Sequence, residues 1–474
     1  MAMGTKRDRE QQEKLFYATE QVDAPGHPFY EELNRVLDGA KFDVFCESEC
    51  AKFYHSKLGR PSLAPGVYFR SLLIGFFEGI GSERGIAWRV ADSLSLRRFL
   101  KYGLEEATPD HVTISRTRRL IDEQTHHAVF TFVLGEVAKR GLLKGKTIGI
   151  DATSLEANAA MKSIVRRDTG ESYMEYLRRL AKQAGSEASD EELRRADRKR
   201  KKKASNEEWK NPHDPDAEVT KMKDGATHFA YKAEQAVDLD TGAIVAITTH
   251  GGATGDTASI ETTLPEAGLA IANQIDTPTE KGQYKVHAQG LQDVVTDKGY
   301  HSDTSLQNMA TAGVRSYVPA PKQQRNWGGK PGEKAVFLAN QRRVTGERGK
   351  QLLKRRGEFL ERPFAHQYET GGLRRMHVRG LTNVYKRVLL QAAACNLALI
   401  LRSFTKAGTP RGLAERNLSL VQSILCLFSA LEGHRTADSD HRRKMHRLFA
   451  SPASVVFRRV GEPPSKKGYL DTGC

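Results

Sequence analysis

Hydrophobic positions in the first part of the chain follow the three- and four-residue spacing of amphipathic helices. The spacing is most regular between Pro65 and Phe99, where large apolar residues are interspersed with polar and charged ones. Pro65 suits the start of a helix, and Gly79–Gly81 suits a break between two helices. We therefore predict that residues 27–140 form an all-α N-terminal domain.

A further helix is predicted after Thr108–Asp110, and it carries Arg116 and Arg118 among its polar residues. Helix–turn–helix packing with a basic second helix is a common way to reach a DNA groove. We predict that these two arginines contact DNA. The alternative is an ordinary helical bundle with a solvated arginine face.

The pattern changes at Gly145, after which short β-branched segments alternate with helical ones. Thr147–Asp151 and Asp293–Asp297 have the character of strands that each end on an acid, and Asp240–Gly242 suits a hairpin turn. Residues 145–404 are thus predicted to form an α/β domain. The other expected elements are strands at His228–Leu239, Ala243–His250 and Arg315–Pro319, helices from Asp256, over Ser302–Ala312, from Gln351 and over Leu381–Phe404, and a loop through Gln323–Gly349.

Two segments stand apart from this α/β pattern. Residues from about 160 to 215 are predicted to be a basic insertion, with a helix near Glu171–Leu180 and a dense basic run at Arg194–Lys203. Such runs are more often solvated than structured, and this one could neutralise a phosphate backbone. Residues 405–474 are expected to form a basic, irregular tail with one apolar helix candidate at Leu418–Leu431.

Charge points to the class of partner. Lys and Arg total 74 against 58 Asp and Glu, a formal net charge of +16, so a polyanion such as nucleic acid is the leading partner. We find no uninterrupted apolar stretch of the length that spans a bilayer and no secretory signal, so we expect a cytoplasmic protein that does not bind membranes. The five scattered cysteines do not suggest a disulfide framework.

Three acids carry the candidate chemistry: Asp151, Asp297 and Glu361. Hard divalent cations prefer oxygen ligands, and a pair of such ions can activate a hydroxyl and stabilise the leaving oxygen of a phosphodiester. The acids are separated by 297 − 151 = 146 and 361 − 297 = 64 residues, so only the fold can bring them together. An Asp at a strand end is by itself more often a turn former than a ligand.

The acids stand in three sequence blocks: IGIDATSLEANAA around Asp151, VVTDKGYHS around Asp297 and ERPFAH from Glu361. These blocks resemble those of the DDE transposases of bacterial insertion sequences, in the insertion-sequence-four superfamily with a helical N-terminal domain. The resemblance extends forward through GRPSLAP, GSERGIAWRVADSLSLRRFL and PDHVTISRTR, and back through HVRGLTNVYKRVLLQAAACNLALILR, so that it covers about residues 27–404.

This resemblance implies an RNase H-like catalytic domain, a mixed five-stranded sheet flanked by helices. Asp151 would lie on the first strand, Asp297 just past the fourth and Glu361 on the following helix. Two Mg²⁺ ions, for which Mn²⁺ can substitute, would be bound by these acids. The enzyme would cut the terminal inverted repeats of a transposon and join the freed 3′-hydroxyl to target DNA. A homodimer on paired double-stranded DNA ends would follow.

The third acid and the DNA contacts are less closely specified by the resemblance. Glu358 and Glu369 are alternatives to Glu361, because the family's usual Arg four residues before this Glu and Lys seven residues after it are replaced by Gly357 and Tyr368. Arginines pair with phosphates through two parallel hydrogen bonds. The predicted phosphate contacts in this region are Lys298, Arg355, Arg356, Arg374 and Arg375.

Three other functions compete with transposition: an RNase H-like nuclease without strand transfer, a non-catalytic DNA-binding protein derived from a transposase, and a basic RNA-processing enzyme. Asp256 is a fourth acid in the region, but its expected role is to cap the helix that it begins.

Overall fold

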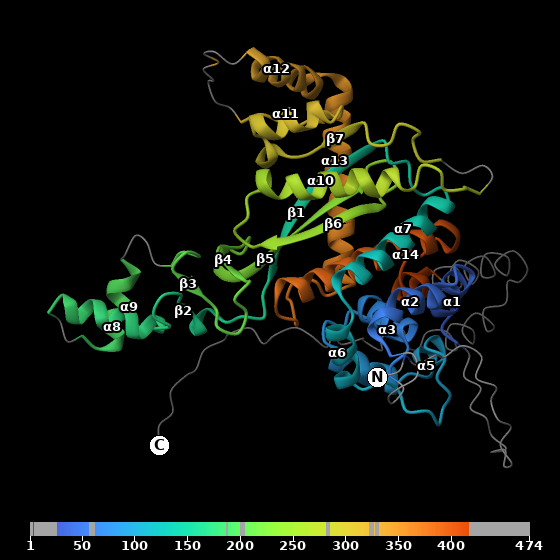
Figure 1. Cartoon of the computed structure of the whole chain (residues 1–474), viewed down its shortest axis with the longest axis horizontal. Helices are drawn as coiled ribbons and strands as arrows, with labels where there is room; N and C mark the ends of the chain where they lie inside the picture. Colours follow the sequence, from blue (N-terminus) through green and yellow to red (C-terminus); the bar gives the residue numbers. More distant parts are fainter. Residues whose placement is uncertain are drawn as a thin grey trace, which may run out of the picture. The chain divides into compact units, whose positions relative to one another are not determined.

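The computed structural model describes Met3 and residues 26–55, 62–185, 188–199, 204–280, 285–321, 327 and 331–416. Residues up to Leu413 form one unit. Its sheet, helices and projecting arm are shown in Figure 1. The predicted apolar tail segment Leu418–Leu431 lies outside the described residues.

The N-terminal region is helical, as the hydrophobic spacing predicts. Four of its helices begin at a Ser or Asp whose side chain accepts a hydrogen bond from an amide of the first turn; these caps are Ser82, Ser93, Asp110 and Asp122. The helices are α1 (Pro28–Gly39), α2 (Phe42–Cys50), η1 (Ala51–Phe53), α3 (Pro65–Phe77), α4 (Glu83–Ala91), α5 (Leu94–Phe99), α6 (His111–Leu120) and α7 (Glu123–Lys139).

Arg70 on α3 is a buried cation within these helices. Its guanidinium contacts Asp38 at 2.7 Å and Asp43 at 2.8 Å, and Arg70 is 1% exposed. The two carboxylates compensate much of the cost of removing this charge from water. Because Asp38 belongs to α1 and Asp43 to α2, these ion pairs connect α3 to both helices.

One mixed sheet follows, formed by β1 (Thr147–Glu156), β4 (Glu218–Lys221), β5 (Thr227–Asp238), β6 (Ile244–Gly251), β7 (Asp293–Val295) and β8 (Arg315–Tyr317). Strands β5, β1, β7 and β8 lie side by side in that order, and β6 and β4 both pair with β5. The β6–β5–β1 pairs are antiparallel, whereas β1–β7 and β7–β8 are parallel. The α/β class predicted from the sequence is confirmed.

Helices cover both faces of this sheet. On β5, Gln235 bonds to Gln367 of α13 (Glu347–Glu369), while the preceding Glu234 bonds to Ser259 of α10 (Asp256–Ala272). Successive side chains of a strand point to opposite faces, so α10 and α13 lie on opposite sides of the sheet. Helix α13 packs on its face of the sheet through a small apolar cluster, formed by Leu239, Val295, Tyr317, Leu352, Leu353 and Phe359.

The remaining helices of the α/β region are α11 (Asp303–Thr311), α12 (Pro331–Thr345) and α14 (Leu381–Thr405). Helix α12 lies where the glycines and basic residues favoured a loop. The Asn340 side chain bonds to both backbone groups of Val318, at 3.0 and 2.7 Å, and so ties this helix to the chain after β8. That contact is tertiary and has no local signature.

Helix α14 packs against α7, α3 and β6, and its apolar residues belong to the same core as the sheet and the N-terminal helices. Within the described ranges, Leu381–Arg416 is the one segment long and apolar enough to cross a membrane, contrary to the sequence expectation of no such segment. Because 67% of its apolar window is buried inside the structure, a core helix explains it.

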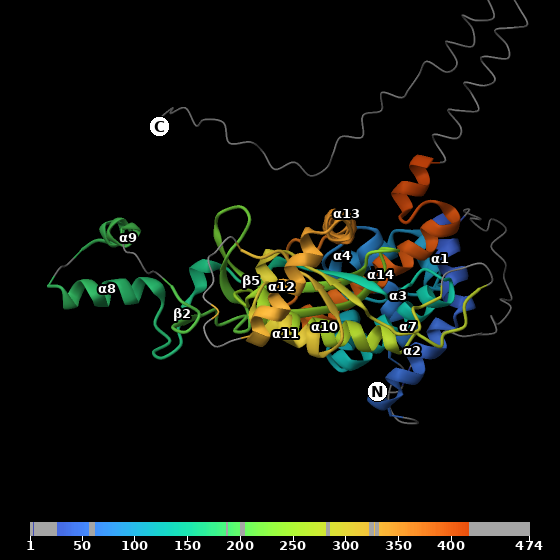
Figure 2. The ribbon, with the colours of Figure 1, turned by 90° about the horizontal axis from the view of Figure 1, so that it is seen from above.

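The predicted insertion forms an arm that projects from the sheet in both Figure 1 and Figure 2. Its strands β2 (Val165–Arg166) and β3 (Trp209–Lys210) pair with each other. The helices α8 (Tyr173–Gln183) and α9 (Asp190–Arg198) lie between these two strands in the chain. Trp209 is 1% exposed and packs on two tyrosine rings of α8. The first part of the predicted basic run Arg194–Lys203 is helical, because α9 extends to Arg198.

Candidate active site

The pairing of β1 with β7 brings two of the predicted acids together. The parallel register joins Thr147 to Asp293 and Gly149 to Val295, an offset of 293 − 147 = 146 residues. Asp151 and Asp297 have the same offset, 297 − 151 = 146. Each acid therefore follows the last residue of its own strand in this pairing by two residues; Asp151 is still within β1, whereas Asp297 lies past the end of β7. Asp151 does not end its strand as predicted, because pairing with β5 extends β1 to Glu156.

Asp151 faces α13. Its Oδ2 atom lies 3.0 Å from a terminal nitrogen of Arg356, whose side chain is 15% exposed, and its Oδ1 accepts from the amide of Ala152 at 2.9 Å. Burial raises the pKa of Asp151 above its ordinary value, the Arg356 charge opposes this shift, and the negative charge of Asp297 adds to it. The two carboxylates are thus close enough to repel each other.

Asp297 starts a short turn rather than continuing the strand. Its Oδ1 caps η3 (Lys298–Tyr300) by accepting from the Gly299 amide at 2.8 Å. A methyl group on Gly299 would lie 2.4 Å from Asp256 Oδ2 and 3.1 Å from Asp297 Oδ1. These two oxygens are therefore at most 2.4 + 3.1 = 5.5 Å apart, and only glycine leaves room for both.

The capping role expected for Asp256 is wrong. Gly255 is the N-cap of α10, and the Asp256 carboxylate instead accepts from Lys232 Nζ at 2.6 Å. Lys232 is a buried residue of β5, and its charge holds Asp256 at the sheet beside the Asp297 turn.

Helix α13 presents the third predicted acid differently from its two alternatives. Leu360 packs against Gly149, and the Tyr368 hydroxyl bonds to the Thr153 hydroxyl on β1. At about 100° per residue, Glu361 lies on the same side of the helix as Tyr368, seven residues later, whereas Glu358 and Glu369 lie opposite Leu360. Glu361 is exposed, and Glu358 pairs with Arg362.

The structure brings Asp151 and Asp297 together but does not gather all three acids. Within the described ranges, no group of three or more His, Cys, Asp or Glu side chains is close enough to hold a metal ion. The carboxylates here are neighbours in pairs: Asp297 adds its charge to the surroundings of Asp151, and Asp256 lies across Gly299 from Asp297.

The basic residues predicted to contact DNA divide into two groups. Lys298 and Arg374 are exposed near the acids: Lys298 follows Asp297, and the Arg374 guanidinium lies 5.6 Å from the centre of the Tyr368 ring. Arg375 is 62% exposed and lies 3.6 Å from Glu156, at the end of β1. Arg356 is engaged by Asp151.

The second group lies away from the acids. Arg355 pairs with Asp240 at 2.9 Å, and Arg116 is exposed on α6. Arg118 is only 15% exposed, and it bonds to Glu83 at 2.6 Å and to Asn383 of α14. Its guanidinium fastens α6 to α4 and α14, which is a structural role that the sequence pattern did not distinguish from a DNA contact.

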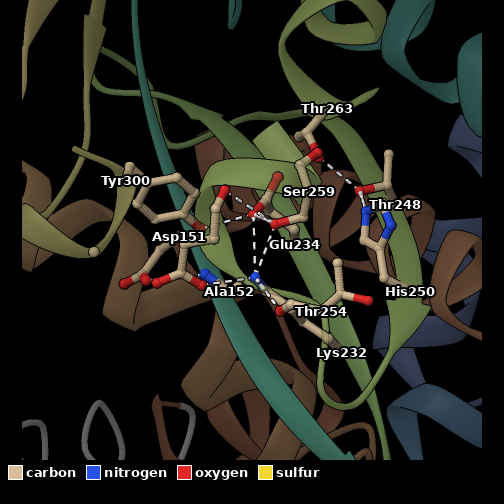
Figure 3. A network of polar contacts seen from close by, with 12 residues as sticks. Asp151, Ala152, Lys232, Glu234, Thr248, His250, Thr254, Ser259, Thr263 and Tyr300 are labelled. Carbon is tan, nitrogen blue, oxygen red and sulfur yellow. Dashed lines mark hydrogen bonds and ion pairs between the residues drawn. The ribbon is translucent and has the colours of Figure 1, made fainter. Parts of the chain in front are cut away.

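Sequence reasoning missed a buried polar network on the α10 face of the sheet (Figure 3). Glu234 is fully buried, and its Oε1 accepts from Ser259 at 2.5 Å and from the Tyr300 hydroxyl at 2.8 Å. Lys232 Nζ lies 3.9 Å from the same oxygen. A signal was available: Lys232 and Glu234 are two charges on the same face of a strand that is otherwise mostly apolar.

Comparison with known proteins bears on the N-terminal helices. Residues 16–120 match the family model described as Transposase domain (DUF772), a match that includes α1 to α6. A search of curated proteins gives no match to the chain. The family match supports the transposase resemblance for the N-terminal region, and the acids lie outside the matched residues.

Proposed function

We propose that this protein is a DDE-type DNA transposase, which cuts transposon ends and joins the freed 3′-hydroxyl to target DNA. The observation that carries the proposal is the parallel pairing of β1 with β7, which brings Asp151 on β1 near Asp297, two residues past the end of β7, while α13 packs on β1. The transposase-domain match over residues 16–120 supports the same class of activity.

The sheet supports an RNase H-like catalytic domain. Leaving aside the short β4, the strand order is β6–β5–β1–β7–β8, three antiparallel strands followed by two parallel ones. Asp151 lies on the first of these strands in the chain, Asp297 follows the fourth, and Glu361 lies on a later helix that covers the sheet. This is the arrangement implied by the sequence resemblance.

The carboxylates suit a hard divalent cation such as Mg²⁺, with Mn²⁺ as a substitute. The Asp151 carboxylate already accepts a positive charge, that of Arg356, and the Asp297 carboxylate is its neighbour. A metal ion bound there would have oxygen donors from both acids. Asp151 and Asp297 would hold the ion, with Glu361 as the third ligand. When bound, the ion would activate a hydroxyl for attack on the phosphodiester.

Basic side chains around the acids suit a DNA phosphate backbone. Lys298, Arg374 and Arg375 are exposed, and Arg356 has a buried donor, Nε, without a partner in the described part of the chain. A scissile phosphate could draw the Arg356 guanidinium from Asp151 and occupy that free donor. We expect double-stranded transposon ends and target DNA as ligands, and a homodimer that pairs two ends.

Single substitutions test the three acids. Asp151→Ala, Asp297→Ala and Glu361→Ala should each abolish Mg²⁺-dependent cleavage of end DNA while leaving DNA binding largely intact. Glu358→Ala and Glu369→Ala are matched controls on the same helix and should retain cleavage. Cleavage that survives Asp151→Ala would contradict the site assignment. Loss of cleavage in Glu358→Ala, with cleavage retained in Glu361→Ala, would assign the role of third acid to Glu358.

The joining step separates a transposase from a nuclease. A pre-cut transposon end with a free 3′-hydroxyl should be joined to plasmid DNA by the wild-type protein and not by Asp151→Ala. Cleavage without any joined product would favour the RNase H-like nuclease, and DNA binding without either reaction would favour a non-catalytic DNA-binding protein.

A further inference from the structure

The sheet holds the Asp297 turn on one side only. The ladder between β7 and β1 ends at Val295, and beyond it the Thr296 amide donates to the Tyr317 carbonyl of β8 at 3.3 Å. The bond that Asp297 accepts from the Gly299 amide is internal to the turn, so it fixes the shape of the turn but not its position against β1. The position of the turn on the β1 side depends on a contact outside the turn.

Tyr300, the last residue of that turn, provides the anchor. Its side chain is 1% exposed, and its hydroxyl donates to Glu234 Oε1 at 2.8 Å. Glu234 lies on β5 directly opposite Ala152, which follows Asp151 on β1. One hydrogen bond thus connects the Asp297 turn to the strand pair that carries Asp151.

Glu234 is itself held from several sides. Ser259 donates to the same oxygen from α10, and Lys232, 4% exposed, places its charge 3.9 Å away (Figure 3). A buried carboxylate costs stability unless it is paired and hydrogen-bonded, and an apolar residue would often stabilise a sheet equally well. A buried carboxyl group that accepts two hydrogen bonds at this position is therefore better explained by a requirement for position than by a gain in stability.

We propose that Glu234 is a positioning residue that holds the Asp297 turn beside Asp151 through the Tyr300 hydroxyl. This inference rests on the proposed function, because it assigns the network to the placing of a metal-binding carboxylate. Neither Glu234 nor Tyr300 touches the metal ion or the DNA. Their removal should weaken metal binding by loosening the position of Asp297.

The test compares two Tyr→Phe variants, each of which loses one buried hydroxyl. Tyr300→Phe removes the anchor, while Tyr68→Phe removes the buried bond to His126 at 3.1 Å among the N-terminal helices. Binding of Mn²⁺ is measured by calorimetry on the full chain without DNA, together with thermal unfolding. Loss of a group that supports a metal ligand typically costs about 10–100-fold in metal affinity, so we expect about tenfold weaker binding by Tyr300→Phe.

Tyr68→Phe should bind Mn²⁺ as the wild-type protein does, even if it unfolds at a lower temperature. Glu234→Gln retains an oxygen that accepts from Tyr300 and should bind more tightly than Glu234→Ala. Wild-type affinity in a folded Tyr300→Phe, or equal weakening in Tyr68→Phe, would overturn the inference. A wild-type protein that neither binds Mn²⁺ nor cuts DNA would overturn the proposed function instead.

Discussion

Arg356 and Asp151 form the contact most open to a quantitative test. In the DNA-free protein the guanidinium lies on the carboxylate that the proposed function assigns to a metal ion. A cation that binds Asp151 must therefore displace or tolerate this charge. Arg356→Gln removes the charge while keeping a polar side chain, so Mn²⁺ should bind more tightly to the variant than to the wild-type protein in the absence of DNA.

The separation sets the size of the effect. Two unit charges 3.0 Å apart attract by about 5–6 kcal/mol at an effective dielectric constant of about 20. Loss of solvation offsets most of this, and the Asp151 side chain is still 32% exposed. Exposed pairs contribute up to about 1 kcal/mol, and broken buried pairs cost about 3–5 kcal/mol. An intermediate value of about 1–2 kcal/mol corresponds to roughly 5–30-fold in Mn²⁺ affinity.

Calorimetric titration of Mn²⁺ into DNA-free protein at pH 7.5 measures this effect directly. Arg355→Gln is the matched control, because it removes the same charge from the adjacent residue, which pairs with Asp240 at 2.9 Å. It should change Mn²⁺ affinity little. Arg356→Gln should also cut DNA more slowly, since under the proposed function the scissile phosphate would lose a cationic partner. Unchanged or weaker Mn²⁺ binding by Arg356→Gln would refute the competition between guanidinium and metal ion.

Three further outcomes follow from the structure. Gly299→Ala should lower Mg²⁺-dependent cleavage at least tenfold in a folded protein, because its methyl group meets the Asp256 and Asp297 carboxylates; wild-type activity would show that the turn can yield. Burial raises the pKa of Asp151, and its protonated form cannot bind a cation, so the acid limb of a cleavage–pH profile should lie above the ordinary aspartate value of about 3.9. Arg70→Leu should lower the free energy of unfolding in urea by about 1 kcal/mol, because Asp38 and Asp43 lose their buried cation but keep Lys101 at 3.2 and 3.3 Å; an unchanged free energy would mean that Lys101 and solvent compensate them fully.

Local patterns in the sequence predicted the elements well where the residues themselves determine them. The helix predicted after Asp110 begins at His111, with Asp110 as its cap, and the two strands around Asp240–Gly242 form the predicted hairpin. The strand before Asp151 was predicted five residues too short, since its continuation depends on pairing with a partner about 80 residues later in the chain. Helix α12 was missed because the Asn340 contact with the chain after β8 is tertiary.

The candidate site was predictable as a set of residues but not as an arrangement. Motifs named Asp151 and Asp297, yet only the folded chain, in which β1 pairs with β7, brings these acids near each other. The role of Asp256 was misassigned, since an acid at a helix start has the same local pattern whether it caps the helix or meets a lysine on the sheet. Arg118 shows the same limit, because burial against Glu83 depends on how helices pack.

The arm between β1 and β5 also affects how such a protein can diversify. The chain leaves and re-enters the sheet at adjacent points, where the amide of Ala157 bonds to the carbonyl of Phe229 at 2.9 Å. Doubling the length of a connection between fixed ends costs only about 0.6 kcal/mol in chain entropy. Descendants of one ancestor could therefore lengthen, shorten or replace the arm, and so change what the molecule binds, while the pairing of β1 with β7 beside the two acids stays the same.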